Sequence, residues 1–300
     1  MNQPAYLKPG STIGIVAPAG VIAPEIVNNA IPFLEQQGFM VKMGAHVLDN
    51  HFQFAATDAN RLTDLQAMMD DPEVHAILAA RGGYGVLRLL PLLNMNGFLR
   101  FPKWICGFSD ITALHCLMSQ FDIPSLHSCM LACFTGKSED LQGTGQLFKF
   151  LAGETVLYSG QTNSFAKSGR VKASIVGGNL SILYALRGTP FEPDIRGKIL
   201  FIEDIDEYVY HIDRMLLNLK LGGWFDEIAG LIIGQFTSLK DHDLGFGLSI
   251  NELLAEYTKE LDIPVITDFP AGHAATNLPL AMGKPASMSV DNSQWTLSFD

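Results

Sequence analysis

The first half of the chain alternates short apolar runs with segments of helical periodicity, and this alternation limits the possible folds more than any other feature. The apolar runs have the length of strands and lie at 12–18, 39–47, 74–80 and 104–109. Helical patterns separate them at 24–37, ended by Gly38, and at 58–71, opened by Asp58 and closed before Pro72. Strands that alternate with helices build a parallel sheet covered on both faces, so this half predicts a parallel α/β domain.

A polar segment at 152–170, rich in Gly, Ser and Thr, interrupts the alternation, and we interpret it as a linker. Beyond it, the pattern predicts strands at 171–177, 197–204, 228–236 and 263–269 and helices at 179–187, 207–221 and 248–260. The tail predicts a closing antiparallel pair around Asp291-Asn292. Because 300 residues suit two such units, we expect an N-terminal parallel-sheet domain with flanking helices over 1–151 and a smaller, β-rich α/β domain over 171–300.

Charge and hydropathy disfavour several classes of partner. The formal net charge of −11 repels polyanions, so we expect no nucleic acid partner. No run approaches the roughly 18 apolar residues of a membrane helix, and the first 20 residues are too weakly basic and too briefly apolar for a secretory signal. We therefore expect a cytoplasmic protein that does not bind membranes.

Four cysteines lie in two local pairs, Cys106 with Cys116 and Cys129 with Cys133. Neither pair has the Cys-x-x-Cys spacing of a zinc site, and the flanking residues are apolar. We expect reduced core residues, no metal and no other cofactor.

The segment "KWICGFSDITALH" (103–115) places Ser109 between the end of a predicted strand and the first turn of a predicted helix. Backbone N–H groups in a first helical turn have no partners within the helix, and Gly107 leaves room for a sharp bend. This arrangement favours a nucleophile whose developing oxyanion is held partly by the N–H of Asp110. A serine at this position is more often an ordinary helix N-cap, and the α/β-hydrolase motif is absent, since Ile111 stands where that motif has glycine.

The segment "AARGGYG" (79–85) follows the third predicted strand. Its glycines allow close approach of the backbone to a ligand, and an oxyanion hole needs a second N–H from a separate loop. The segment lacks the residues of a P-loop and the spacing of a dinucleotide fingerprint. We favour a second oxyanion donor here, although a turn that needs positive φ explains any single glycine.

A serine nucleophile needs a histidine base, and the base needs an orienting acid. Among eight histidines, His273 lies in a Gly/Ala-flanked loop just beyond a predicted strand, where sites of parallel sheets collect. His115 is expected to point away, two turns along the helix after Ser109. Glu203 is the first polar residue after Ile199–Ile202, a position that suits the orienting acid and the solvated start of a helix equally well.

Five segments fall in the order and approximate spacing typical of one family: "RGGYG" (81–85), "GFSD" (107–110), "GGNLSIL" (177–183), "FIEDIDE" (201–207) and "AGHAATNLPLAMG" (271–283). Together they resemble the LD-carboxypeptidase family of serine peptidases, which includes microcin-immunity peptidases. The resemblance covers essentially the whole chain and implies two domains that meet in a catalytic cleft. It also implies a cytoplasmic homodimer that needs no metal.

Carried onto this sequence, the resemblance implies Ser109 as nucleophile, His273 as general base and Glu203 as the acid that orients it. It implies an oxyanion hole formed by the N–H groups of Asp110 and Gly83. The expected reaction releases the terminal D-alanine from a murein tetrapeptide stem through an acyl-enzyme. As candidate substrate-binding residues we add Arg81, Tyr84 and Arg187, with either arginine available for the terminal carboxylate.

Two other functions stay open. Immunity-type relatives cleave peptidyl or aminoacyl nucleotides and stack an aromatic residue of the connecting segment on the base, but 152–170 holds Tyr158 and Phe165 and no tryptophan. A non-catalytic two-lobed protein that binds a small anion explains the glycines, but not why a Ser, a Glu and a His each follow a strand.

Overall fold

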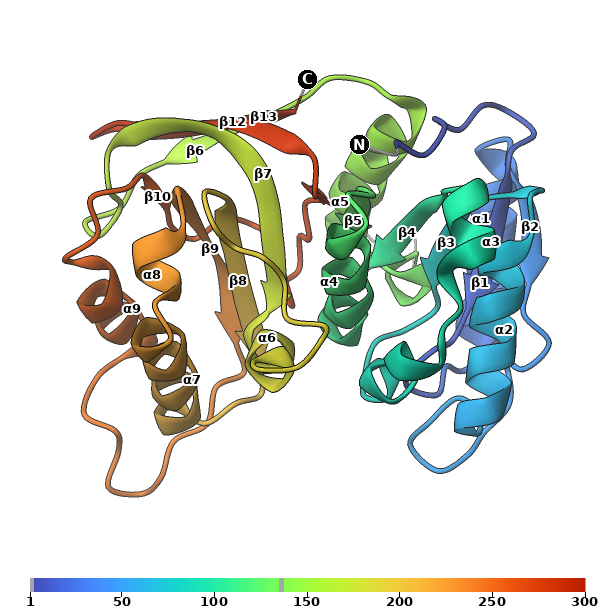
Figure 1. The fold of residues 1–300 in the computed structure, drawn as a ribbon, viewed down its shortest axis with the longest axis horizontal. Coiled ribbons are helices and arrows are strands. Elements are labelled where there is room, and N and C mark those ends of the chain that lie inside the picture. Colours follow the sequence, from blue (N-terminus) through green and yellow to red (C-terminus); the bar gives the residue numbers. More distant parts are fainter. Residues whose placement is uncertain (1–2, 135–137, 300) are drawn as a thin grey trace.

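Hydrogen bonds join the parallel strands of both halves into one long sheet in the computed structural model, which describes residues 3–134 and 138–299 (Figure 1). The first half contributes five parallel strands in the order β5-β4-β3-β1-β2. Their bounds are Thr12–Val16 (β1), Met40–Met43 (β2), Val74–Ala79 (β3), Trp104–Gly107 (β4) and Ser125–His127 (β5). This is the parallel sheet that the alternation predicts, with β2 shorter than expected because the chain turns at Gly44.

The second half contributes four further parallel strands in the order β7-β8-β9-β10. They span Gly169–Asn179 (β7), Ile199–Ile205 (β8), Gly230–Thr237 (β9) and Val265–Ile266 (β10). A short strand, β11 (Leu280–Met282), joins the two groups: it runs antiparallel to β5 and parallel to β7. The expected α/β class with a mostly parallel sheet is confirmed.

An antiparallel layer closes the second half. The long strand β7 pairs with β12 (Pro285–Val290), which pairs with β13 (Gln294–Phe299) across the turn expected around Asp291. The partner of β13 on its other side is β6 (Val156–Gln161).

The strand β6 corrects one expectation. The segment 152–170 is not merely a linker, because six of its residues form β6 and its last two begin β7. Val156 and Tyr158 are buried while Leu157 is exposed, so the segment has the alternating burial of a strand with one face on the core. The domain limits at 151 and 171 remain a prediction.

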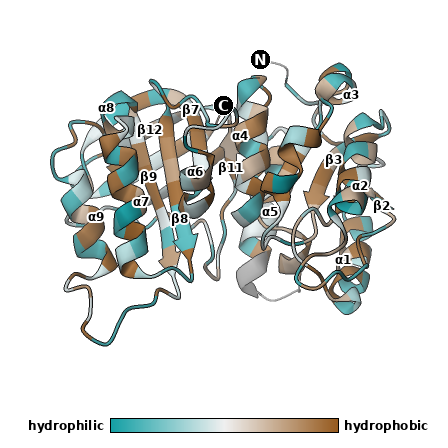
Figure 2. Ribbon diagram, turned by 60° about the horizontal axis from the view of Figure 1, so that its bottom comes forward, coloured by the Kyte–Doolittle hydropathy of each residue, from teal (hydrophilic) through white to brown (hydrophobic). Residues whose placement is uncertain are grey.

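Helices cover the sheet. The first half holds α1 (Pro24–Gln36), α2 (Asp58–Asp70), α3 (Met95–Arg100), α4 (Thr112–Gln120) and α5 (Ser138–Ala152). The second holds α6 (Leu180–Leu186), α7 (Val209–Leu221), α8 (Trp224–Glu227) and α9 (Ile250–Thr258). Figure 2 shows hydrophobic strands enclosed by helices with one polar side, such as α7 and α9. No helix among the described residues is long and apolar enough to cross a membrane.

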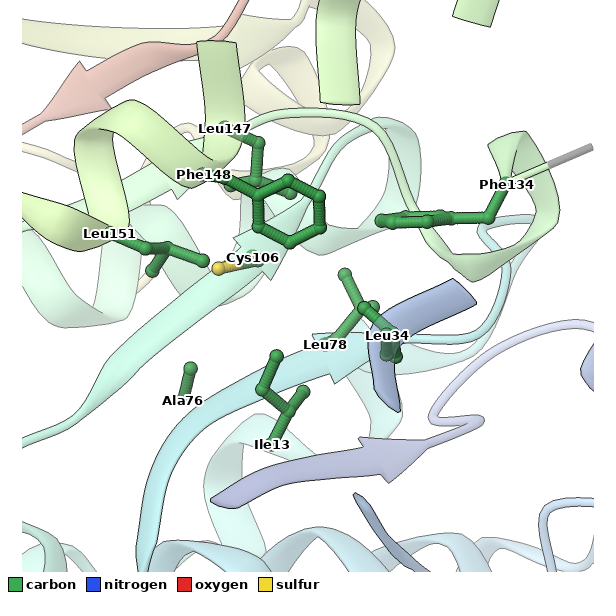
Figure 3. A pocket seen from close by; sticks show the side chains of 9 residues that line it. All are labelled: Ile13, Leu34, Ala76, Leu78, Cys106, Phe134, Leu147, Phe148 and Leu151. Atoms are coloured by element: carbon green, nitrogen blue, oxygen red, sulfur yellow. The ribbon is translucent and has the colours of Figure 1, made fainter. Parts of the chain in front are cut away.

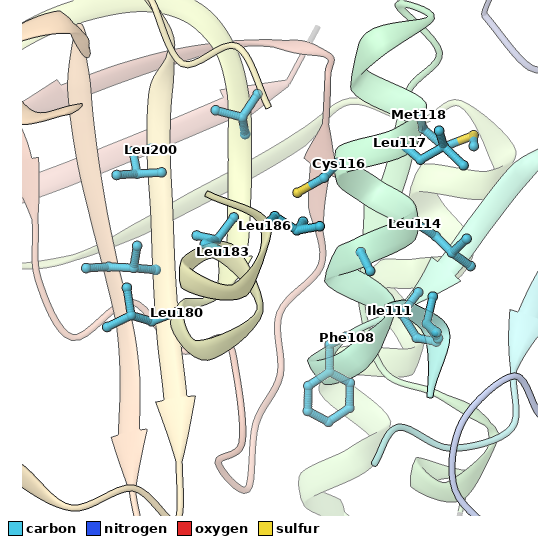
Figure 4. Packing of buried hydrophobic residues seen from close by; sticks show 14 of the residues in the cluster. Phe108, Ile111, Leu114, Cys116, Leu117, Met118, Leu180, Leu183, Leu186 and Leu200 are labelled. Atoms are coloured by element: carbon cyan, nitrogen blue, oxygen red, sulfur yellow. The ribbon is translucent and has the colours of Figure 1, made fainter. Parts of the chain in front are cut away.

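Helix α4 lies between the two halves and packs against both. In Figure 4, Leu114 and Leu117 point toward the first half, whereas Cys116 points toward Leu183 and Leu186 of α6. All five side chains belong to one buried apolar cluster that crosses the boundary. Since α4 begins just after Ser109, this packing fixes the turn that carries Ser109 relative to the second half.

A second apolar cluster lies on the opposite face of the sheet and contains a small cavity of about 10 Å³, enough for about one water molecule (Figure 3). Cys106 and Phe148 are among its lining residues, which are all apolar. Burial raises the pKa of the Cys106 thiol, and it raises the pKa of Cys116 to about 12. These thiols therefore stay protonated and serve as core residues, as expected.

Candidate active site

The order of the first five strands creates a switch point between β1 and β3, where ligand sites of such sheets form beyond the strand ends. The chain leaves β1 and β3 in two glycine-containing loops that touch, because the N–H of Gly20 donates to the carbonyl of Gly82 at 2.9 Å. The neighbouring strand β4 ends at Gly107, two residues before Ser109. The topology therefore brings the glycine loop 81–85 and Ser109 to one place.

Ser109 sits on a strained turn. Its φ of 62° lies in the left-handed region, which disfavours residues with a Cβ and holds them there at a cost of order 1–3 kcal/mol. It begins a single 3-10 turn, η3 (Ser109–Ile111), which leads into α4. This geometry is that of an elbow that presents a nucleophile, and it fits an N-cap less well, since η3 has no side-chain cap.

The glycine loop lies directly against this serine. A Cβ added to Gly82 would stand 2.9 Å from the Ser109 Cβ and 3.0 Å from its Oγ, so only glycine permits the approach. Gly83, the next residue, carries one of the two N–H groups expected to hold the oxyanion. Asp110 carries the other, and it is buried with its carboxylate Oδ2 accepting the N–H of Val86 at 2.8 Å.

Glu203 and His273 form a hydrogen-bonded pair. Nδ1 of His273 lies 2.8 Å from Oε2 of Glu203, and Glu203 is fully buried while the His273 side chain is 15% exposed. Glu203 lies within β8, and Gly272 allows its carboxylate to fit, since a Cβ there would stand 2.7 Å from Oε2. With Nδ1–H donating to the carboxylate, Nε2 of His273 is left to take up a proton.

The two halves converge at this pair. The ring of His273 packs against Phe108, the residue before Ser109, with ring centroids 4.7 Å apart and the two planes tilted by 57°. Thr237, at the end of β9, holds the His273 carbonyl through its Oγ1 at 2.9 Å. The structure thus brings the Glu203–His273 pair of the second half against Phe108, the residue next to Ser109 in the first half.

Two further histidines lie beneath the elbow. His115 has partners other than Ser109 on both ring nitrogens: its Nε2 is 2.9 Å from the Gly107 carbonyl and its Nδ1 is 2.8 Å from Ser125 Oγ. Burial lowers the pKa of His115 to about 4, so the neutral ring donates to Gly107. His127 is fully buried against Phe108, and burial lowers its pKa.

Two of the three candidate substrate-binding residues lie in the glycine loop, and the third lies after α6. Arg81 is exposed beside Gly82, with Nη1 donating to the Val21 carbonyl at 2.9 Å, and Tyr84 is 47% exposed in the same loop. Arg187 has its guanidinium over Trp224 and its Nε 3.3 Å from Glu192, so a role at the substrate carboxylate stays a prediction for this residue. It follows the C-terminal end of α6, about 12 Å along the axis from the helix start that contacts the site.

Several residues that support the site have no signal in the sequence. Arg61 on α2 is buried behind the glycine loop and donates to the carbonyls of Pro18 and Ala56. Asp204, beside Glu203, accepts the Asn179 side chain at 3.0 Å, and burial raises the pKa of Asp204 to about 6. These contacts join segments far apart in sequence.

Within 3–134 and 138–299, no three His, Cys, Asp or Glu side chains gather as a metal site requires.

Comparison with known proteins identifies the family of this chain. Family models of the N- and C-terminal domains of LD-carboxypeptidases match residues 13–128 and 172–288. The probable murein peptide carboxypeptidase of Bacillus subtilis is 36% identical over 292 residues, which are 96% of this chain and 92% of that protein. The microcin C7 self-immunity protein MccF of Escherichia coli is 28% identical, over 96% of this chain and 93% of its own length.

A solved structure shares the whole fold. Muramoyltetrapeptide carboxypeptidase from Oxalobacter formigenes superposes with a TM-score of 0.87 at 28% identity, over 96% of this chain and 98% of that one. The chain therefore belongs to the LD-carboxypeptidase family and is a serine-type carboxypeptidase.

Proposed function

We propose that this enzyme hydrolyses the L,D amide bond that releases D-alanine from murein tetrapeptide stems, with Ser109, His273 and Glu203 as its catalytic triad. One observation carries the proposal: the Glu203–His273 pair of the second half reaches Phe108, next to the strained serine of the first half. A binding protein needs no such convergence of nucleophile, base and acid.

In the first half-reaction, Ser109 Oγ attacks the carbonyl carbon of the scissile amide while Nε2 of His273 takes the hydroxyl proton. The Glu203 carboxylate holds Nδ1–H and stabilises the imidazolium that forms. The N–H groups of Asp110 and Gly83 hold the negative oxygen of the tetrahedral intermediate. Collapse breaks the C–N bond, and the imidazolium gives its proton to the departing amine of D-alanine.

In the second half-reaction, water attacks the acyl-enzyme and His273 takes a proton from it. The ester bond to Ser109 breaks, the serine recovers its proton from His273, and the shortened peptide leaves with a new carboxylate. Arg81 is the exposed first residue of the glycine loop and supplies the cation that we assign to the substrate carboxylate.

The placement of the aromatic residues supports a peptide substrate over a nucleotide conjugate. The three tryptophans, Trp104, Trp224 and Trp295, are all buried. Tyr158 is also buried and donates its hydroxyl to the Pro279 carbonyl, and Phe165 is packed against the core. None of these rings is presented for stacking on a base.

The test compares four substrates with the purified enzyme: a tetrapeptide stem ending in D-alanine, its L-alanine epimer, the D-alanine stem with diaminopimelate in place of lysine, and an aminoacyl-adenylate analogue. We expect release of D-alanine from the D-configured stems and little turnover of the epimer, measured by chromatography with mass detection. Preferential cleavage of the adenylate would replace the proposal with the immunity-type function. Tight binding of stems without any turnover would favour a binding protein.

A further inference from the structure

The side chain of Asp110 is not explained by the roles given to it so far. Its backbone N–H belongs to the proposed oxyanion hole, whereas its carboxylate is 1% exposed and turns away from solvent toward the start of the 3-10 turn η1 (Val86–Arg88). Oδ2 accepts the Val86 N–H at 2.8 Å, and the N–H of Gly85 also favours the charged form. Oδ1 has no hydrogen-bond partner among the described residues.

A buried carboxylate with an unpaired oxygen contributes little to stability, because its desolvation is only partly offset. Its position offers a better explanation. The two proposed donors lie on different segments, Asp110 on the elbow and Gly83 on the glycine loop. Such donors act together only when their relative position is held within about 0.5 Å. The Asp110 carboxylate binds the backbone N–H groups of Gly85 and Val86, two and three residues after Gly83. This contact joins the elbow to the glycine loop.

We propose that the Asp110 side chain is a positioning clamp that fixes the Gly83 N–H relative to the Asp110 N–H, and that the enzyme loses rate when this clamp is released. The inference rests on the proposed function, since it assigns a role within the proposed oxyanion hole. Arg61 supports the clamp: its guanidinium fills the space that a Cβ at position 85 would occupy, donates to the Pro18 carbonyl and carries the charge opposite to Asp110.

The surroundings of Asp110 make the clamp sensitive to pH. Burial raises the pKa of Asp110 to about 6, against the opposing effects of Arg61 and of the loop N–H groups. On α4 the nearest titratable side chain is His115, which is engaged by Gly107 and Ser125, and β7 contributes the uncharged Gly178 at the start of α4. The ionised carboxylate holds the loop, so the clamp is closed above pH 6 and released as Asp110 gains its proton below it.

The variant Asp110→Asn keeps the shape and one acceptor but removes the charge. We expect kcat for D-alanine release to fall about 10- to 100-fold at pH 8 with KM nearly unchanged, because displacement of a catalytic group by 1 Å costs about 100-fold. In the wild type the acid limb of the kcat profile should include loss of a proton from Asp110 near pH 6. In the variant this component should be absent.

The matched control is Asp64→Asn. Asp64 is also a buried aspartate that accepts a backbone N–H, from His46 at 2.8 Å, but it lies on α2 and binds the turn after β2, not the elbow. This control should keep the wild-type kcat and the wild-type acid limb. Unchanged kcat and an unchanged limb in Asp110→Asn, with an active wild type, would overturn the clamp.

Hydrogen exchange tests the clamp without relying on turnover. The amides of 83–86 should exchange faster in Asp110→Asn than in the wild type at pH 7, and protection in the wild type should fall between pH 7 and pH 5 after correction for the intrinsic rate. Equal protection at both pH values would overturn the clamp even if Asp110→Asn does not fold. An inactive wild type with a protected loop would instead count against the proposed function alone.

Discussion

The contact between Gly82 and Ser109 makes Gly82→Ala a sharp test of the elbow. An added Cβ would stand 2.9 Å from the Ser109 Cβ and 3.0 Å from Oγ, whereas ordinary contacts begin near 3.4 Å. Ser109 or the glycine loop must therefore yield by about half an ångström. The φ of Gly82 is outside the left-handed range, so alanine fits its backbone and the perturbation acts through this contact.

We expect kcat to fall about 10- to 100-fold, because nucleophile and carbonyl carbon must approach within about 3–3.5 Å and a 1 Å error costs about 100-fold. Overpacking should lower the free energy of unfolding by no more than about 1–3 kcal/mol, so the variant stays folded. Steady-state release of D-alanine measures kcat, and chemical denaturation measures stability.

Gly145→Ala is the control for this substitution. Gly145 lies in α5, and a Cβ there meets nothing within 4 Å. This variant should keep the wild-type kcat and gain up to about 1 kcal/mol of stability. If Gly82→Ala retains kcat within threefold of the wild type while it is folded, the claim that the glycine loop positions the Ser109 side chain is wrong.

Three further predictions follow from the site. Glu203→Gln should lower kcat about 10³- to 10⁴-fold with little change in KM, since it removes the charge that holds the Nδ1–H tautomer of His273; a loss below tenfold in a steady-state assay contradicts the triad. Burial lowers the pKa of His115 from 6.5 to about 4, so between these pH values the unfolded chain binds a proton that the folded chain does not. This difference should reduce the free energy of unfolding by about 3 kcal/mol as the pH falls from 6.5 to 4. His115→Gln, which keeps a donor for the Gly107 carbonyl, should lose this part of the pH dependence in denaturant titrations, and an unchanged slope would show that the ring is charged in the fold. Turnover should survive prolonged treatment with EDTA, because the proposed steps use a hydroxyl, an imidazole and backbone N–H groups; a loss restored by added zinc points to a metallopeptidase.

Most of the fold follows from hydrophobic periodicity, because each buried strand and each amphipathic helix carries its own pattern. The predicted helix at 24–37 is Pro24–Gln36 in the structure, and the predicted strand at 197–204 is Ile199–Ile205. The strand β6 was not predicted, because its alternation of buried and exposed residues is short and its partner, β13, is more than 130 residues away. The local sequence of 156–161 does not show that it pairs with a strand so far along the chain.

In the candidate site, too, some residues could be predicted from the sequence and others could not. Ser109, Glu203 and His273 each belong to the end of a strand or the loop beyond it, and position along a parallel sheet is what the sequence pattern predicts. The partners of Arg187 and His115 lie on other segments of the chain, so the sequence pattern does not reveal them. The side-chain contacts of Arg61 arise from packing across the fold, which no local pattern encodes.

The most direct test of the acyl-enzyme mechanism is the rate of D-alanine release by Ser109→Ala, measured beside the wild type with a tetrapeptide stem. Loss of the hydroxyl removes the nucleophile and little else, since Ser109 begins η3 without a side-chain cap. We predict a fall in kcat of at least about 10⁴-fold, with peptide binding and the circular dichroism spectrum retained. Turnover within tenfold of the wild type would contradict the mechanism and move the nucleophile elsewhere.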